Sequence, residues 1–205
     1  MRCLRCHRPA SLCYCARLAP VATTTRVVFL QHPRERRVRI GTARMAYLGL
    51  ANAELHLGVT FAANPRVQAL ATDPSARAAL LFPGDGAHDP ATLPGGRPAT
   101  LVVVDGTWSQ ARKVLARNPA LAALPRVGFA LERPSRYRVR REPAPHCLST
   151  VEAVVEALRR FEGDGGRFAP LLSAFEDMVA TQLACAAERP RPYRRACGHG
   201  SRRTS

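Results

Sequence analysis

Apolar residues follow two kinds of pattern along this chain. Short continuous runs predict strands at Arg26–Gln31, Ala78–Phe82, Thr100–Val104 and Arg126–Leu131. Elsewhere, apolar side chains recur every three or four positions, as they do on one face of a helix. This spacing predicts helices near residues 34–49, from Trp108 to Asn118, at Leu148–Phe161 and at Leu171–Leu183. Strands that alternate with helices indicate an α/β domain with a mainly parallel sheet flanked by helices.

Composition divides the chain into three parts. Residues 1–20 hold four closely spaced cysteines, and we expect a small N-terminal zinc knuckle there. Residues 21–187 hold the predicted strands and helices and form the expected α/β domain. Residues 188–205 contain six arginines and two prolines, so we expect a basic, disordered tail.

The net charge of +16 is the most unusual feature of the composition. Arginine and lysine together number 31 against 15 acidic residues, and Lys113 is the only lysine. A guanidinium pairs with phosphate through two parallel hydrogen bonds, so this excess favours a polyanionic partner such as nucleic acid. A bias toward arginine that serves no such partner is the alternative.

No apolar run reaches the roughly 18 residues that span a bilayer. Charged and sulfur-bearing residues interrupt the first positions, where a secretory signal would need an apolar core. We therefore expect a cytoplasmic protein that binds no membrane, and we predict no stable protein partner. In a reducing cytoplasm, clustered cysteines indicate metal ligands before disulfides.

Four of the seven cysteines lie within thirteen positions, as Cys3-x-x-Cys6 and Cys13-x-Cys15. Four thiolates satisfy the tetrahedral preference of Zn²⁺ and leave no open position for substrate. The pattern therefore predicts a structural zinc site with no catalytic role. Redox-active or merely free cysteines are the alternative. The scattered Cys147, Cys185 and Cys197 are expected in the core or on the surface.

An acidic residue ends the most apolar strand. Asp105 follows a run of valines, and ligands of open α/β sheets bind at the carboxyl ends of strands. Gly106 permits a tight turn, and Thr107 stands three residues before Gln110, the spacing of a helix capping box. Trp108 starts the following helix. Each residue alone is typical of ordinary structure, but together at a strand end they indicate an active site.

A second capping box is predicted at Ser149 and Glu152, before the helix Leu148–Phe161. The free N–H groups of such a helix start suit a carboxylate or a phosphate. Two more strands end at His32-Pro33 and at Pro83-Gly84. His32 alone is more typical of a structural histidine than of a catalyst.

Five arginines flank one tyrosine between residues 133 and 141. Arginines clamp phosphates and aromatic rings stack on bases, so this segment favours contact with RNA. A solvated loop is the alternative, although five like charges in so short a segment repel one another. The residues that we expect to contact RNA are Arg133, Arg136, Tyr137, Arg138 and Arg140.

In this order and spacing, the motifs resemble those of the DTW-domain family of tRNA-uridine aminocarboxypropyltransferases. The resemblance rests on the four cysteines of the knuckle, on Leu30-Gln31-His32-Pro33 and on Asp105-Gly106-Thr107-Trp108. The segments Pro134–Arg140 and Leu148–Glu152 support it, so that it covers roughly residues 1–187 and leaves out the basic tail.

The resemblance implies a SPOUT-like fold with a C-terminal knot that binds S-adenosylmethionine. It also implies a reaction in which the 3-amino-3-carboxypropyl group moves from S-adenosylmethionine to N3 of a tRNA uridine, leaving methylthioadenosine and giving acp3U. Asp105 would be the general base that removes the N3 proton. The residues expected to bind the co-substrate are Pro83, Gly106, Thr107, Trp108, Leu131, Leu148, Ser149 and Thr150.

Two alternatives stay open at this point. An RNA methyltransferase would use the same co-substrate and would differ only in which carbon faces the nucleophile. A zinc-stapled RNA-binding protein without catalytic activity would have the same charge and the same cysteines.

Overall fold

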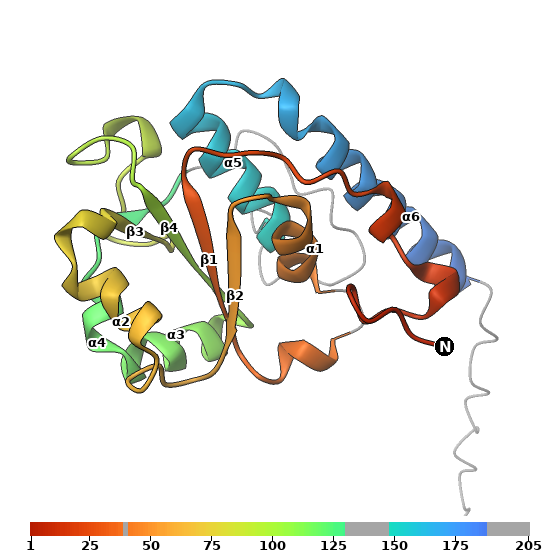
Figure 1. The fold of residues 1–205 in the computed structure, drawn as a ribbon, viewed down its shortest axis with the longest axis horizontal. Helices are drawn as coiled ribbons and strands as arrows, with labels where there is room; N and C mark the ends of the chain where they lie inside the picture. The colour runs from red at the N-terminus through yellow and green to blue at the C-terminus, as the bar shows by residue number, and fades with distance from the viewer. Residues whose placement is uncertain (39–40, 130–147, 188–205) are drawn as a thin grey trace, which may run out of the picture.

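The computed structural model describes residues 1–38, 41–129 and 148–187 (Figure 1). Its strands are β1 (Arg26–Gln31), β2 (Ala53–Leu57), β3 (Ala78–Leu81), β4 (Thr100–Asp105) and β5 (Arg126–Val127). Its α-helices are α1 (Thr42–Gly49), α2 (Pro65–Thr72), α3 (Trp108–Arg117), α4 (Pro119–Ala122), α5 (Thr150–Glu162) and α6 (Ala169–Ala187). Short 3-10 turns include η1 (Ala10–Leu12), η2 (Cys15–Arg17), η3 (Glu35–Arg37), η4 (Pro74–Ala76), η5 (Pro90–Thr92) and η6 (Gly166–Phe168).

The five strands form one sheet in the order β2-β1-β4-β3-β5, and all the pairings are parallel. From β1 the chain continues through α1 to the neighbouring β2, whereas from β4 it continues through α3 and α4 to β5 at the opposite edge. The connections therefore leave β1 and β4 in opposite directions. Ligands of open α/β sheets bind at such a switch point, outside the carboxyl ends of the strands. In the register of these two strands, Gln31 is paired with Asp105.

Alternate residues of the strands pack on opposite faces of the sheet. Val27 and Phe29 join a core with α1, α5 and α6, whereas Val28 and Leu30 join a second core with α2, α3 and α4. Figure 1 shows these helix groups on either side of the sheet. Both faces of β1 are thus buried, which explains why its sequence is a continuous apolar run.

The predicted α/β class is confirmed as a parallel sheet flanked by helices, and most predicted elements are present. The helix expected near residues 34–49 is wrong in its first half: the described residues 34–38 contain only the short η3, and α1 begins at Thr42. This half is rich in arginine and has too few apolar side chains to bury a helical face. β5 is also shorter than expected, and Pro119, expected beyond a helix end, starts α4.

β2 and α2 are absent from the predictions. β2 lies at the edge of the sheet, and its polar Glu54 and His56 interrupt the apolar run that marks a buried strand. A signal for α2 was present, because Asn64 caps the helix by accepting a hydrogen bond from the Val67 N–H and Pro65 occupies its first turn.

Several predictions fall outside the described residues. They concern Leu131, the arginine-rich segment with Arg133, Arg136, Tyr137, Arg138 and Arg140, the tail 188–205, and Cys147 and Cys197. The SPOUT-like knot likewise stays a prediction. Within the described ranges, no helix combines the length and the apolar character needed to cross a membrane.

Helix α1 ends against α6 at a glycine. A Cβ added to Gly49 would lie 2.5 Å from Cδ1 of Leu171, which is buried. We expect Gly49→Ala to lower the free energy of unfolding by about 1–3 kcal/mol, because the core must shift to admit the methyl group. Gly41→Ala is the matched control, since its nearest neighbour would be Cβ of Arg44 at 3.9 Å. Chemical denaturation of both variants measures the difference, and equal stabilities would contradict this account of the α1–α6 contact.

Candidate functional site

Asp105 lies at the carboxyl end of β4 with its side chain almost completely buried. Its Oδ2 accepts a hydrogen bond of 2.8 Å from Nε2 of Gln31, at the end of β1. Its Oδ1 accepts one of 2.9 Å from the hydroxyl of Thr150, in the first turn of α5. These donors compensate the cost of burying a carboxylate. The surroundings of Asp105 are therefore polar, although the valines before it are apolar.

The turn after Asp105 is tightly packed. A Cβ on Gly106 would lie 2.9 Å from Oε1 of Gln110 and 3.4 Å from Cβ of His32. The capping box at the start of α3 is present: the Thr107 N–H donates to Oε1 of Gln110 at 2.7 Å, and Oγ1 of Thr107 accepts from the Gln110 N–H at 3.3 Å. Gly106 and Thr107 thus have structural roles: they stabilise the turn beside the carboxylate of Asp105.

Trp108 begins α3 and is 36% exposed. Its ring meets Phe82 edge to face, with 5.6 Å between the ring centroids. Phe82 follows β3, so this pair lies at the same carboxyl edge of the sheet as Asp105. Pro83 comes next in the chain and is exposed. An exposed aromatic ring beside an exposed proline offers a surface on which a planar ligand can stack.

The start of α5 faces the same edge. Glu152 accepts hydrogen bonds from the N–H and from the hydroxyl of Ser149, at 2.9 and 2.7 Å. The Thr150 N–H donates to Oγ1 of Thr42, at the start of α1, at 3.2 Å. The predicted cap at Ser149 is therefore present, and the hydroxyls of Ser149 and Thr150 are both engaged inside the protein. Leu148 precedes them and is half-buried.

His32 follows Gln31 and pairs its N–H with the carbonyl oxygen of Asp105 at 2.9 Å. Burial lowers the pKa of its imidazole, and the positive charges of Arg34 and Lys113 lower that pKa further. Its Nδ1 accepts a hydrogen bond of 3.3 Å from the Arg34 N–H. His32 is therefore a neutral histidine that stabilises the turn after β1. This agrees with its interpretation from the sequence as a structural histidine.

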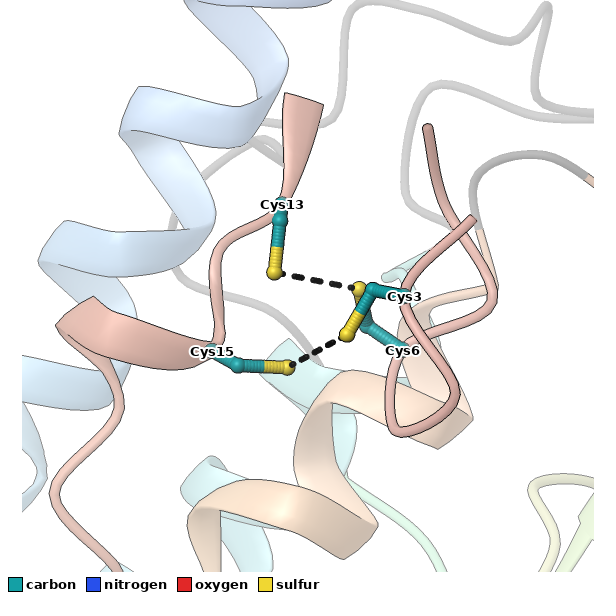
Figure 2. Close-up of side chains that lie close together, drawn as sticks. All are labelled: Cys3, Cys6, Cys13 and Cys15. Carbon is teal, nitrogen blue, oxygen red and sulfur yellow. Dashed lines mark hydrogen bonds between the residues drawn. The ribbon is translucent and has the colours of Figure 1, made fainter. Parts of the chain in front are cut away.

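The four N-terminal cysteines converge on one point (Figure 2). Their sulfur atoms all lie within 4.8 Å of one another. Cys3 and Cys15 are 3.8 Å apart, and Cys6 and Cys13 are 3.7 Å apart, measured between the Sγ atoms. Four Zn–S bonds of about 2.3 Å would place tetrahedral sulfurs about 3.8 Å apart. The four sulfurs are thus close enough together to hold one metal ion, and two of the sulfur pairs have the spacing of a tetrahedral zinc site.

The electrostatics of the cluster also favour a cation. Backbone N–H groups of Cys6 and Arg5 lower the pKa of Cys3 to about 6. Burial raises the pKa of Cys15, and the neighbouring thiols raise it further. Four thiolates cannot stay ionised together unless a positive ion neutralises their mutual repulsion. A divalent metal supplies that charge.

The knuckle is attached to the main core. Tyr14 is buried, and the guanidinium of Arg8 lies over its ring at 5.8 Å. Arg8 also donates to Oε1 of Gln182 at 3.4 Å, and Arg17 pairs with Asp177 at 3.1 Å, so both arginines reach α6. The knuckle therefore lies against α6, as in Figure 1.

The structure brings Asp105, Gly106 and Thr150 together at the carboxyl edge of the sheet, and Pro83 follows β3 at the same edge. Two residues of this site were missed as candidates. Gln31 was noted only as part of a motif, and Thr42 was not singled out. A glutamine that ends an otherwise apolar strand was a usable signal for Gln31, because burying an amide requires a partner. Nothing in the sequence indicated that Thr42 would meet α5.

Comparisons with known proteins find one family match and several related sequences. The DTW domain family matches residues 1–183 of the chain. The chain is 33% identical over 172 residues to tRNA-uridine aminocarboxypropyltransferase 2 of Drosophila melanogaster, covering 78% of this chain and 66% of that protein. It is 28% identical to the mouse protein of the same name, over 88% of this chain and 63% of that protein. An Arabidopsis thaliana tRNA-uridine aminocarboxypropyltransferase A is 26% identical, with 80% of its length covered. The chain thus spans less than two thirds of the first two relatives, and no solved structure matches it significantly.

We expect about one zinc ion per chain in the purified protein, because the four sulfurs lie close enough together to bind one ion. Cys6→Ser should reduce bound zinc to less than about half an equivalent and lower the melting temperature, since metal binding contributes to folding. Cys185→Ser, in α6, is the matched control and should keep its zinc. Elemental analysis measures both variants. Wild-type protein without zinc, or a Cys6→Ser variant with a full equivalent, would rule out this site.

Proposed function

This chain belongs to the DTW domain family, and we propose that it is a tRNA-uridine aminocarboxypropyltransferase that uses S-adenosylmethionine. The names of its relatives support this activity. The observation that carries the proposal is the buried carboxylate of Asp105 at the switch point between β1 and β4, held by Gln31 and Thr150. A ligand site is expected at this position, and a fixed carboxylate there suits proton transfer.

In the proposed reaction, a carboxylate oxygen of Asp105 takes the N3 proton of uridine. The electron pair left on N3 attacks the γ-carbon of the methionine chain. The bond between this carbon and the sulfonium sulfur breaks, and its electron pair stays on sulfur. The products are N3-substituted uridine (acp3U), protonated Asp105 and neutral methylthioadenosine.

The co-substrate would lie along the carboxyl edge of the sheet. We propose that Pro83 and the exposed ring of Trp108 contact the adenosine, and that Gly106 and Thr107 shape the turn beneath it. Leu148, Ser149 and Thr150 would border it at the start of α5. Leu131 stays a predicted contact outside the described residues.

The RNA would bind through arginine. The excess of positive charge supports a polyanionic partner. We propose phosphate and base contacts for Arg133, Arg136, Tyr137, Arg138 and Arg140, on the sequence argument alone. We also propose that residues 1–20 form a structural zinc module and that residues 21–187 form a SPOUT-like, knotted catalytic domain. Residues 188–205 are proposed to be a basic, disordered tail that belongs to neither part.

Incubation of the protein with S-adenosylmethionine and unmodified tRNA tests the activity. Nucleoside mass spectrometry should detect a uridine that is heavier by an aminocarboxypropyl group, and methylthioadenosine should accumulate in equal amount. Formation of S-adenosylhomocysteine would instead identify a methyltransferase. Tight tRNA binding without either product would identify an RNA-binding protein and end the proposal.

Asp105→Asn separates catalysis from binding. Asparagine is nearly isosteric and keeps an acceptor for Thr150, but it cannot take a proton. We expect the transfer rate to fall by about 10²–10⁴-fold, as when a general base is lost, with tRNA affinity nearly unchanged. Asp73→Asn is the control, because Asp73 is exposed and caps η4 away from this edge. Single-turnover kinetics and a filter-binding titration distinguish the two effects, and full activity of Asp105→Asn would remove Asp105 from the mechanism.

A further inference from the structure

A polar cleft lies between the zinc knuckle and the carboxyl end of β1. Its volume of about 10 Å³ has room for about one water-sized group, such as an ammonium. The cleft is therefore suited to one part of a larger ligand. Its walls come from the knuckle, from β1, from η3 and from the start of α1, and include Cys6, Tyr14, Gln31, Arg36, Gly41 and Arg44.

Gln31 connects this cleft to Asp105. Its side chain is 1% exposed, and its Nε2 donates to Oδ2 of Asp105 at 2.8 Å. Because a carboxylate only accepts hydrogen bonds, this contact fixes which end of the amide is the nitrogen. The other end, Oε1, is buried and has no hydrogen-bond partner among the described residues. An unsatisfied buried acceptor costs about 1–3 kcal/mol, so Oε1 is poised for a donor from a ligand.

The charged groups of the cleft indicate a ligand with charges of both signs. Arg36 and Arg44 line it and attract an anionic group. Glu35 also lines it, is buried, and makes the potential beside Gln31 more negative. An α-amino acid has a carboxylate for the arginines and an ammonium group, which donates hydrogen bonds, for Oε1 of Gln31. A uracil base is neutral and has no anionic group to pair with the two guanidinium groups.

We propose that this cleft binds the α-amino acid end of S-adenosylmethionine, with its ammonium group on Oε1 of Gln31 and its carboxylate between Arg36 and Arg44. This inference rests on the proposed function, because it assumes that co-substrate. The hydroxyls of Ser149 and Thr150 are engaged within the protein, which leaves the cleft better able to hold this group. The γ-carbon of the methionine chain would then lie near Gln31, which is hydrogen-bonded to Asp105.

Two ligands that differ by this group provide the test. S-adenosylmethionine has the amino acid chain, and methylthioadenosine lacks it. Calorimetric titration of the zinc-loaded protein, without tRNA, should show S-adenosylmethionine binding at least about tenfold more tightly. The variant Arg36→Gln/Arg44→Gln should reduce this preference to less than about threefold by weakening S-adenosylmethionine alone. The control Arg97→Gln/Arg117→Gln changes exposed arginines outside the cleft and should keep the preference.

Decarboxylated S-adenosylmethionine separates the two halves of the proposed contact. It keeps the amino group, so its affinity should fall with Gln31→Met but not with Arg36→Gln/Arg44→Gln. Circular dichroism verifies that Gln31→Met is folded, and an unchanged affinity for methylthioadenosine verifies that its adenosine site is intact. A general structural defect would weaken all three ligands alike.

Each other outcome overturns the inference. If the arginine variant weakens both ligands equally, or weakens tRNA binding while the preference for S-adenosylmethionine persists, the cleft serves another group. If the wild type transfers the aminocarboxypropyl group but shows no preference, the amino acid end lies elsewhere and the proposed function stands. If the wild type binds neither ligand and makes no acp3U, the proposed function itself fails.

Discussion

The parallel pairing of β1 with β4 is the constraint on which the rest of this structure depends. It places Gln31 opposite Asp105, 74 residues further along the chain, at the point where the connections of the two strands diverge. An amide and a hydroxyl donate to the carboxylate buried there, and these hydrogen bonds offset the cost of its burial. The hydroxyl belongs to Thr150, so the position of α5, and through Thr42 that of α1, is connected to the same carboxylate.

The cysteine knuckle, residues 1–20, extends this arrangement on one side. It lies against α6 and forms part of the wall of the cleft that Gln31 also lines. Oε1 of Gln31 is buried and has no hydrogen-bond partner among the described residues. A metal that holds four thiolates would keep this small knuckle rigid, which its few buried side chains alone would not achieve. A metal held by these cysteines would thus bear on the shape of the proposed co-substrate site.

Charge is distributed unevenly between the surface and the site. The chain has a large excess of arginine, which suits an anionic RNA, yet the buried charged residues at the carboxyl edge include the acidic Asp105 and Glu35. S-adenosylmethionine is a sulfonium with an ammonium group, so acidic side chains in its vicinity are favourable. An excess of positive charge for the proposed RNA partner is compatible with acidic side chains near the proposed co-substrate, because these acidic side chains are buried.

The sequence by itself determined the local features. Continuous apolar runs defined β1 and β4, and hydroxyl and acid or amide pairs at the right spacing defined the starts of α3 and α5. The spacing of the four cysteines indicated a cluster that could hold a metal ion. These features were readable because each signal acts over a few residues. The sequence did not indicate β2, whose polar residues suit an edge strand, and it did not indicate the partners of Asp105. Those depend on tertiary structure, because the order of strands in a sheet and the docking of α5 bring together residues that no local pattern relates. The role of Gln31 depends on them most, since its buried oxygen and the cleft beside it exist only once the knuckle, β1 and α1 are assembled.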